Sequence, residues 1–252
     1  MGLLLDRLPP LTPSASLSEA RRLLIDHRAR SLAVVESEKR PRLLGVVTRR
    51  TLLQVTATRQ APRVSSIAEE PPLTLSPAGD WRSAARSLVE AREPAAPVVD
   101  ERGFYLGFYS LDTAISLALR KGSPRLYEKV TTIAKPVERV FSPDDPVYLA
   151  WQYILSGGDA AVVVRDGKPL GVVTEYDLLR RGYTRPLFEA GAPRRGPKLL
   201  EVMSTPLYTL ESSAPLVEAA RLIVERRIGR VYIVEDGELK VATRLDVAAA
   251  LV

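Results

Sequence analysis

The chain has 252 residues, 46% of them apolar and 26% charged, with a net charge of +6 and no cysteine. This composition is typical of a soluble globular protein, and the lack of cysteine excludes disulfides and thiolate metal sites. No window approaches the roughly 18 unbroken apolar residues of a membrane span, and residues 1–7 lack the features of a signal peptide. We therefore expect a cytoplasmic protein without a membrane segment. Its positive charge favours anionic partners such as nucleotides or nucleic acid.

The first half of the chain predicts helix, strand, strand and helix, twice over. Ser16-Leu17-Ser18-Glu19 is a capping-box pattern ahead of a helix that reaches His27. Strands are expected over 31–36 and 43–48, followed by a helix over 51–58. The second round predicts a helix over 81–91, strands over 96–100 and 105–110, and a helix over 111–119.

The second half repeats this order after a break at 121–124, where Gly122 and Pro124 interrupt the pattern. A third copy opens at Val130, with Pro146 at the start of a helix that reaches Leu155. Residues 183–198 are the longest stretch without periodicity, and we expect them to be a linker. The fourth copy predicts a helix from Pro215 and a strand over 230–235.

A short motif closes each copy, in which an apolar strand ends in Thr or Ser and a helix begins. The hydroxyl residues are Thr48, Ser110, Thr174 and Thr243. They are spaced by 62 (48 to 110), 64 (110 to 174) and 69 (174 to 243) residues. Solenoid repeats are typically ~20–50 residues long. The spacing therefore favours a small α/β unit used four times.

These motifs resemble the CBS domain, a family whose copies occur in tandem pairs called Bateman modules. The resemblance covers essentially the whole chain and implies an α/β (α+β) fold of four βαββα units, over 1–62, 63–122, 123–184 and 185–252. Units of this size are marginal alone, so we expect them to pair into one module over 1–122 and another over 123–252. The family implies a regulatory, non-enzymatic role. It also implies that AMP, ADP or ATP, and in some members S-adenosylmethionine, binds between paired units.

Two carboxylates carry the predicted ligand site. Asp177 and Asp246 follow Thr174 and Thr243 by three residues. A carboxylate at a helix start can accept both hydroxyls of a ribose, and the Thr hydroxyls with nearby backbone N–H groups suit ligand oxygens. A single acid at such a place is more often a helix cap, so the repetition in register is what favours binding.

The four copies are not equivalent, because copies one and two carry Thr51 and Thr113 where the other two carry Asp. We therefore expect the C-terminal module to bind the nucleotide. The resemblance implies that Arg230 reaches the phosphate of the ligand at Asp177, which would make that site the stronger one. Arg244 or Lys135 would take this role at Asp246. By analogy, the adenine slots would be lined by Lys135-Pro136-Val137, Gly158, Thr205-Pro206 and Gly229.

Other classes of function stay open at this point. An alternative is nucleic-acid binding through a basic cluster, although a solvated linker explains the cluster as well and no aromatic residues interleave with it. The cluster consists of Arg180, Arg181, Arg185, Arg194, Arg195 and Lys198. Catalysis is not expected, because His27 is the only histidine and the sequence shows no metal-ligand cluster and no Walker loop. The regulated partner is not identified, and a homodimer disc remains an alternative to a disc formed by one chain.

Overall fold

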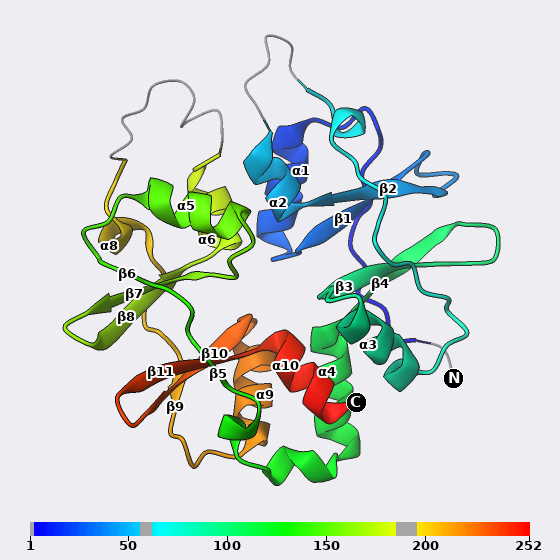
Figure 1. Ribbon diagram of the computed structural model, residues 1–252. Helices are drawn as coiled ribbons and strands as arrows, with labels where there is room; N and C mark the ends of the chain where they lie inside the picture. Colours follow the sequence, from blue (N-terminus) through cyan, green and yellow to red (C-terminus); the bar gives the residue numbers. More distant parts are fainter. Residues whose placement is uncertain (1–2, 56–61, 185–195) are drawn as a thin grey trace. The chain divides into compact units, whose positions relative to one another are not determined.

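The computed structural model describes residues 3–55, 62–184 and 196–252 (Figure 1). The four copies fold alike, each with a helix, two antiparallel strands and a closing helix. The first copy consists of α1 (Leu17–Asp26), β1 (Ser31–Val35), β2 (Leu43–Thr48) and α2 (Arg49–Gln54). The second consists of α3 (Trp81–Glu90), β3 (Ala95–Val99), β4 (Tyr105–Ser110) and α4 (Leu111–Lys121).

The third and fourth copies repeat this order and add short elements around it. The third consists of α5 (Val147–Leu155), β7 (Ala161–Arg165), β8 (Lys168–Val173) and α6 (Glu175–Arg181). The fourth consists of α9 (Leu216–Arg226), β10 (Arg230–Glu235), β11 (Glu238–Thr243) and α10 (Arg244–Leu251). The short elements are η1 (Val64–Ser66), η2 (Pro124–Tyr127), η3 (Val130–Thr132), β5 (Lys135–Pro136), β6 (Val140–Phe141), α8 (Leu199–Val202) and β9 (Thr209–Leu210).

Most predicted boundaries are confirmed to within a few residues. The Oγ of Ser16 accepts the N–H of Glu19 and caps α1, while Pro146 and Pro215 stand at the N-caps of α5 and α9. The closing helix of the first copy begins at Arg49 rather than 51, because Thr48 serves as its cap. The predicted linker over 183–198 and the end of the helix predicted over 51–58 lie largely outside the described residues.

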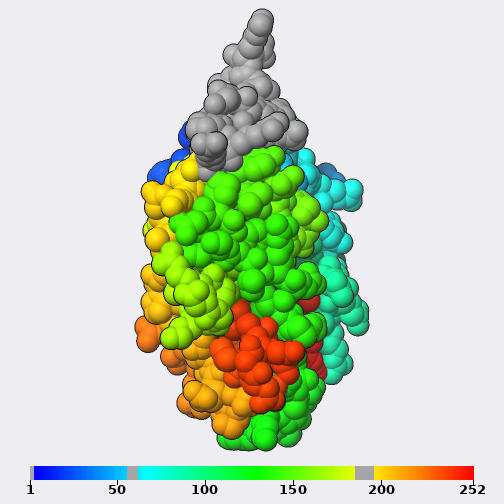
Figure 2. Space-filling model, turned by 60° about the vertical axis from the view of Figure 1, so that its left-hand side comes forward, coloured from blue at the N-terminus to red at the C-terminus, as the bar shows by residue number. Residues whose placement is uncertain are grey.

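All four sheets have the same order. In each, the second strand of the copy pairs with the first, and the first pairs in parallel with a short segment that precedes the copy's first helix. In the fourth copy the order is β5-β11-β10-β9. The other edge of each sheet is a segment from outside the copy, such as β5 beside β11. The space-filling view shows the green region of β5 beside the orange-red β10–β11 hairpin (Figure 2).

The chain divides into two compact units, each with its own core. Unit 1 comprises Met1–Arg7, Pro71–Glu138 and Tyr208–Val252, and unit 2 comprises Leu8–Glu70 and Arg139–Leu207. Unit 1 therefore combines the second and fourth copies, and unit 2 the first and third. In unit 1, Ile115 of α4 and Leu251 of α10 belong to one core. In unit 2, Leu53 of α2 and Leu178 of α6 share the other.

The predicted modules over 1–122 and 123–252 stay a prediction, and the two compact units group the copies in a different way. The closing helices take part in this grouping. In α4, Leu111, Ala114, Ile115 and Ala118 are all buried. These four residues lie on one face of the helix, and α4 packs against α9 and α10 of the fourth copy in one core. No helix among the described residues is long and apolar enough to cross a membrane.

Candidate functional site

The four strand-to-helix junctions are built on the same hydrogen bond. At each, the hydroxyl that ends the strand accepts the backbone N–H of the third residue of the helix. The N–H groups in the first turn of a helix have no partner within the helix, so this bond stabilises its start. The four caps are Thr48, Ser110, Thr174 and Thr243. The sequence motif therefore predicted the junctions correctly.

In the third and fourth copies, the third helical residue is an aspartate that closes a capping box. Oδ2 of Asp177 accepts the N–H of Thr174 at 2.9 Å and its hydroxyl at 2.7 Å. Oδ2 of Asp246 accepts the N–H of Thr243 at 3.0 Å and its hydroxyl at 2.6 Å. Both aspartates are thus helix caps, and in each one Oδ1 points away from the box and is available to another group.

A residue from a distant segment reaches each junction and contacts the third helical residue; we call it the crossing residue. The crossing residues are Glu69, Asp6, Ser204 and Lys135 in copies one to four. Each pairs in an antiparallel bridge with the residue two places before the capping hydroxyl, for example Ser204 with Val172 and Lys135 with Val241. The four junctions therefore have one architecture and four different sets of side chains.

The third copy uses this architecture to bury its carboxylate. Asp177 is only 2% exposed, and its Oδ1 accepts the hydroxyl of Ser204 at 2.5 Å. The backbone of the crossing segment approaches Gly171 so closely that an added Cβ would lie 2.7 Å from the carbonyl oxygen of Ser204. Both oxygens of Asp177 are engaged by protein donors, so this carboxylate stabilises the junction.

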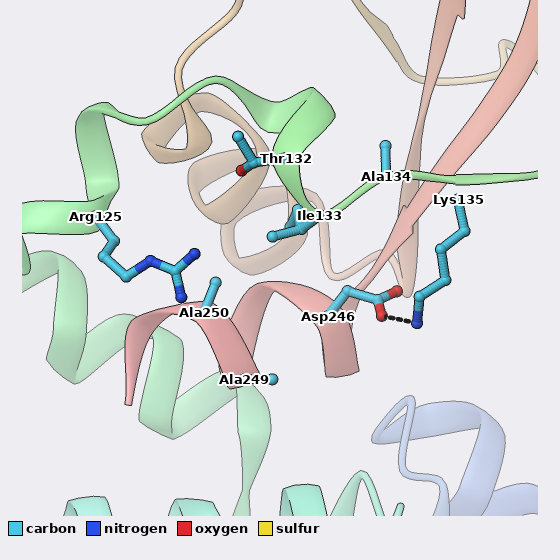
Figure 3. A pocket seen from close by; sticks show the side chains of 8 residues that line it. All are labelled: Arg125, Thr132, Ile133, Ala134, Lys135, Asp246, Ala249 and Ala250. Atoms are coloured by element: carbon cyan, nitrogen blue, oxygen red, sulfur yellow. Dashed lines mark hydrogen bonds and ion pairs between the residues drawn. The ribbon is translucent and has the colours of Figure 1, made fainter.

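The fourth copy leaves its carboxylate at the edge of a cavity of about 340 Å³. Oδ1 of Asp246 accepts a hydrogen bond from Nζ of Lys135 at 2.6 Å, and the Lys135 side chain is 70% exposed. Figure 3 shows Asp246 and Lys135 together on one side, with Arg125 on the opposite side beyond Ala250. The remaining lining residues are Thr132, Ile133, Ala134 and Ala249. The cavity thus combines an anchored carboxylate, two cations and an apolar wall.

The guanidinium of Arg125 pairs with the carboxylate of Glu128. Its Nε donates to Oε1 at 3.0 Å and its Nη2 donates to Oε2 at 3.0 Å. The hydrogen bonds from Arg125 hold the pKa of Glu128 below its usual range, and the same bonds raise the pKa of Arg125. Both side chains are more than 40% exposed, so the pair is weak and the guanidinium can also meet an anion.

Comparison with known proteins identifies the family. The family model of the CBS domain matches residues 4–57, 130–183 and 199–252. The chain belongs to the CBS-domain family. The model does not match the second copy, yet the structure gives that copy the same element order and the same junction.

Relatives and solved structures agree with this assignment. An uncharacterised protein of Methanocaldococcus jannaschii is 25% identical over 94% of this chain, and the chain spans 58% of that relative's length. A crystal structure of another protein of that organism, proposed as an archaeal homologue of the AMPK gamma subunit, matches with a TM-score of 0.83 at 17% identity. That match covers 98% of this chain and 97% of the other. A conserved protein of Pyrococcus horikoshii matches along the full length of both chains, with a TM-score of 0.66 and 17% identity. These likenesses establish the fold.

Within the CBS fold, Arg244 is not available to a ligand. It is 7% exposed; its Nε donates to Oδ1 of Asp112 at 2.6 Å and its Nη2 to the carbonyl oxygen of Ile228. The guanidinium therefore joins α10 to α4 and does not face the predicted phosphate position at Asp246. The position of Asp112, one residue before Thr113, explains why this acid meets the neighbouring helix.

Arg230 and Asp177 were predicted to hold one ligand between the third and fourth CBS copies. Arg230 begins β10 in unit 1 and is 9% exposed, whereas Asp177 belongs to unit 2. Their pairing stays a prediction. Gly158 lies against the ring of Tyr153, and an added Cβ would be 2.5 Å from that ring. Its predicted place in an adenine slot also stays a prediction.

The remaining predicted residues divide between the two units. Lys135, Pro136, Val137, Gly229, Thr243 and Asp246 belong to unit 1, and Gly158, Thr174, Thr205 and Pro206 to unit 2. Among these, Lys135 and Asp246 are in direct contact at a cavity. In the predicted nucleic-acid cluster, residues 185, 194 and 195 lie outside the described residues, and Lys198 pairs with Asp144 at 2.7 Å. Within the described part of the chain, no cluster of His, Cys, Asp and Glu could hold a metal ion.

The sequence prediction named Lys135 at the Asp246 site but missed the other crossing residues, Glu69, Asp6 and Ser204. A signal for them exists, because Val64-Ser65-Ser66-Ile67-Ala68-Glu69 and Val130-Thr131-Thr132-Ile133-Ala134-Lys135 are two versions of one segment. Comparing them would have placed Glu69 and Lys135 at equivalent positions.

Proposed function

We propose that this CBS-domain protein is a non-enzymatic regulatory protein that binds an adenine nucleotide (AMP, ADP or ATP) in the cavity beside Asp246. The observation that carries the proposal is the arrangement of that cavity. A carboxylate fixed by Thr243 stands at one side, and two cations, Lys135 and Arg125, line the same space. Its volume of about 340 Å³ lies in the range typical of small-molecule pockets.

The cavity offers each part of a nucleotide a suitable group. Oδ1 of Asp246 is the acceptor for the ribose hydroxyls, since Oδ2 is already held by Thr243. The ammonium of Lys135 and the guanidinium of Arg125 attract the phosphate. Ile133, Ala134 and the alanines of α10 supply the apolar wall that a base needs.

The contact between Lys135 and Asp246 does not oppose binding strongly. An ion pair with one side chain this exposed contributes only about 0–1 kcal/mol. A ribose diol therefore replaces the ammonium on Oδ1 at little cost, and the released ammonium can turn to the phosphate. Family membership supports a regulatory use of such binding, in which the bound state is read by a protein partner of unknown identity.

Isothermal titration of AMP, ADP, ATP and S-adenosylmethionine into the full chain tests the proposal. We expect one or more adenine nucleotides to bind, and Asp246→Asn to weaken binding at least about tenfold, because a hydrogen bond to a charged acceptor contributes about 1.5–3 kcal/mol. Asp236→Asn is the matched control, since Asp236 is an exposed acid on the β10–β11 turn of the same unit. Absence of binding at millimolar concentration, or equal effects of the two variants, would contradict the proposal.

A further inference from the structure

Unit 2 contains a second cavity, of about 460 Å³, at the junction of the first CBS copy. It is lined by Thr51, Gln54 and Val55 of the closing segment, by Pro62, and by Ser66, Ile67, Ala68 and Glu69. Seven of these eight residues have an equivalent in the lining of the Asp246 cavity, and the exceptions are Pro62 here and Arg125 there. Residues 66–69 correspond to 132–135, and residues 51, 54 and 55 correspond to 246, 249 and 250. The two cavities are therefore versions of one site in two separate units.

The charged groups are exchanged between the two versions. In the Asp246 cavity, the helix carries the carboxylate and the crossing segment carries the ammonium of Lys135. In the second cavity, the helix carries the hydroxyl of Thr51, and the crossing segment carries the carboxylate of Glu69. The hydroxyl of Thr51 donates to Oε2 of Glu69 at 3.3 Å. The exchange replaces a neutral ion pair by a single carboxylate, so at this position the second cavity is more negative by one charge.

The exchange keeps a carboxylate that can accept ligand hydroxyls and removes the ammonium that attracts a phosphate. Glu69 is exposed, and among the described residues its carboxylate forms no ion pair, so its oxygens remain available to hydroxyl donors. Lys135 is one of the two cations that attract a phosphate in the other cavity, and at its position here stands the anion Glu69, which repels a phosphate.

We propose that the Thr51–Glu69 cavity binds a ribonucleoside without phosphate, through hydroxyls that donate to Glu69, and that it discriminates against nucleotides. The inference rests on the proposed function for the equivalence of the two cavities. It extends that function by giving the chain one site that prefers a phosphorylated ligand and one that prefers an uncharged ligand. A protein with this pair of sites responds to the dephosphorylated ligand as well as to the phosphorylated one.

The test uses the full chain with Asp246→Asn, which isolates the second cavity, and adenosine and AMP as probes in isothermal titration. We expect adenosine to bind at least about tenfold more tightly than AMP, from the repulsion between one carboxylate and a phosphate. Adding Glu69→Gln, which preserves the size of an exposed side chain, should weaken the binding of adenosine at least about tenfold. Equal affinity for AMP and adenosine, no binding of adenosine, or no effect of Glu69→Gln would overturn the inference.

A variant that carries the equivalents of Asp246 and Lys135 in the second cavity provides the reverse test. Thr51→Asp together with Glu69→Lys installs the side chains of the Asp246 cavity, and AMP should then bind to the Asp246→Asn background at least about tenfold more tightly than before. No gain of AMP binding, with an unchanged unfolding midpoint, would overturn the charge argument. The two proposals can fail separately. Absence of AMP binding by the wild-type chain would contradict the nucleotide proposal, while adenosine binding that depends on Glu69 would still support the second site.

Discussion

Asp177 and Asp246 occupy equivalent positions, and the structure predicts that their removal affects stability unequally. Asp177→Ala removes three hydrogen bonds from a carboxylate that is 2% exposed, and it leaves the hydroxyl of Ser204 and the N–H of Thr174 without their acceptor. Buried donors left without a partner cost about 1–3 kcal/mol each, and losing a helix cap costs about 1 kcal/mol. We expect a loss of about 3–5 kcal/mol, allowing for non-additivity.

Asp246→Ala removes the same capping box at a more exposed place. The side chain of Asp246 is 12% exposed, and its Oδ1 partner, Lys135, is 70% exposed and is solvated when released. The cap, which includes the acceptor of the Thr243 N–H, and a weak ion pair are lost, but no donor equivalent to the Ser204 hydroxyl is left buried, so we expect about 1–2 kcal/mol. The difference between the two variants should therefore be roughly 2–3 kcal/mol, well above the error of an unfolding measurement.

Urea unfolding of both variants, followed by circular dichroism, measures this difference through the midpoint at unchanged slope. Thr174→Ala and Thr243→Ala are matched controls, because they remove the cap and leave the carboxylates. Equal destabilisation by Asp177→Ala and Asp246→Ala would refute the view that one carboxylate is structural and the other available to a ligand.

Three further predictions concern single contacts. Gly171→Ala should cost about 1–3 kcal/mol, because the added Cβ would lie 2.7 Å from the Ser204 carbonyl oxygen; Gly79→Ala, whose Cβ would have 3.6 Å to its nearest neighbour, should leave the urea midpoint unchanged. Arg244→Ala should cost about 1.5–3 kcal/mol through the lost bonds to Asp112 and Ile228, and a change below about 0.5 kcal/mol would show that this contact does not hold α10. Hydrogen bonds from Ser83 hold the pKa of Asp80 below its usual 3.8, so its contribution to stability is complete above that pH and is lost as the pH falls through the lowered pKa. Asp80→Asn should therefore flatten the acid limb of the stability curve, and an unchanged limb would contradict this.

The sequence predicted the parts of the structure that depend on near neighbours. A hydroxyl ahead of a helix caps that helix whatever the rest of the chain does, so Thr48, Ser110, Thr174 and Thr243 could be assigned from the motif alone. The strands followed from their β-branched residues and turn signals in the same way.

The partner of Asp177 could not be predicted, and Lys135 was placed near Asp246 only through the family resemblance, because both partners come from far along the chain. Ser204 reaches Asp177 through one isolated bridge, and Lys135 reaches Asp246 through a strand of two residues. Such short segments carry no periodicity. The grouping of copies into two compact units could not be predicted for a related reason: the buried face of α4 does not say in its sequence which other helix covers it. Arg244 could equally have met solvent, a phosphate or Asp112, and only the packing of α10 on α4 decides between them.

A crystal structure of the full chain grown with AMP tests the central claim most directly. We expect the ribose hydroxyls within hydrogen-bonding distance of Oδ1 of Asp246, with the ammonium of Lys135 moved from that oxygen to the phosphate. AMP bound away from this cavity, or crystals that hold no nucleotide at saturating concentration while Lys135 keeps its contact with Asp246, would contradict the account.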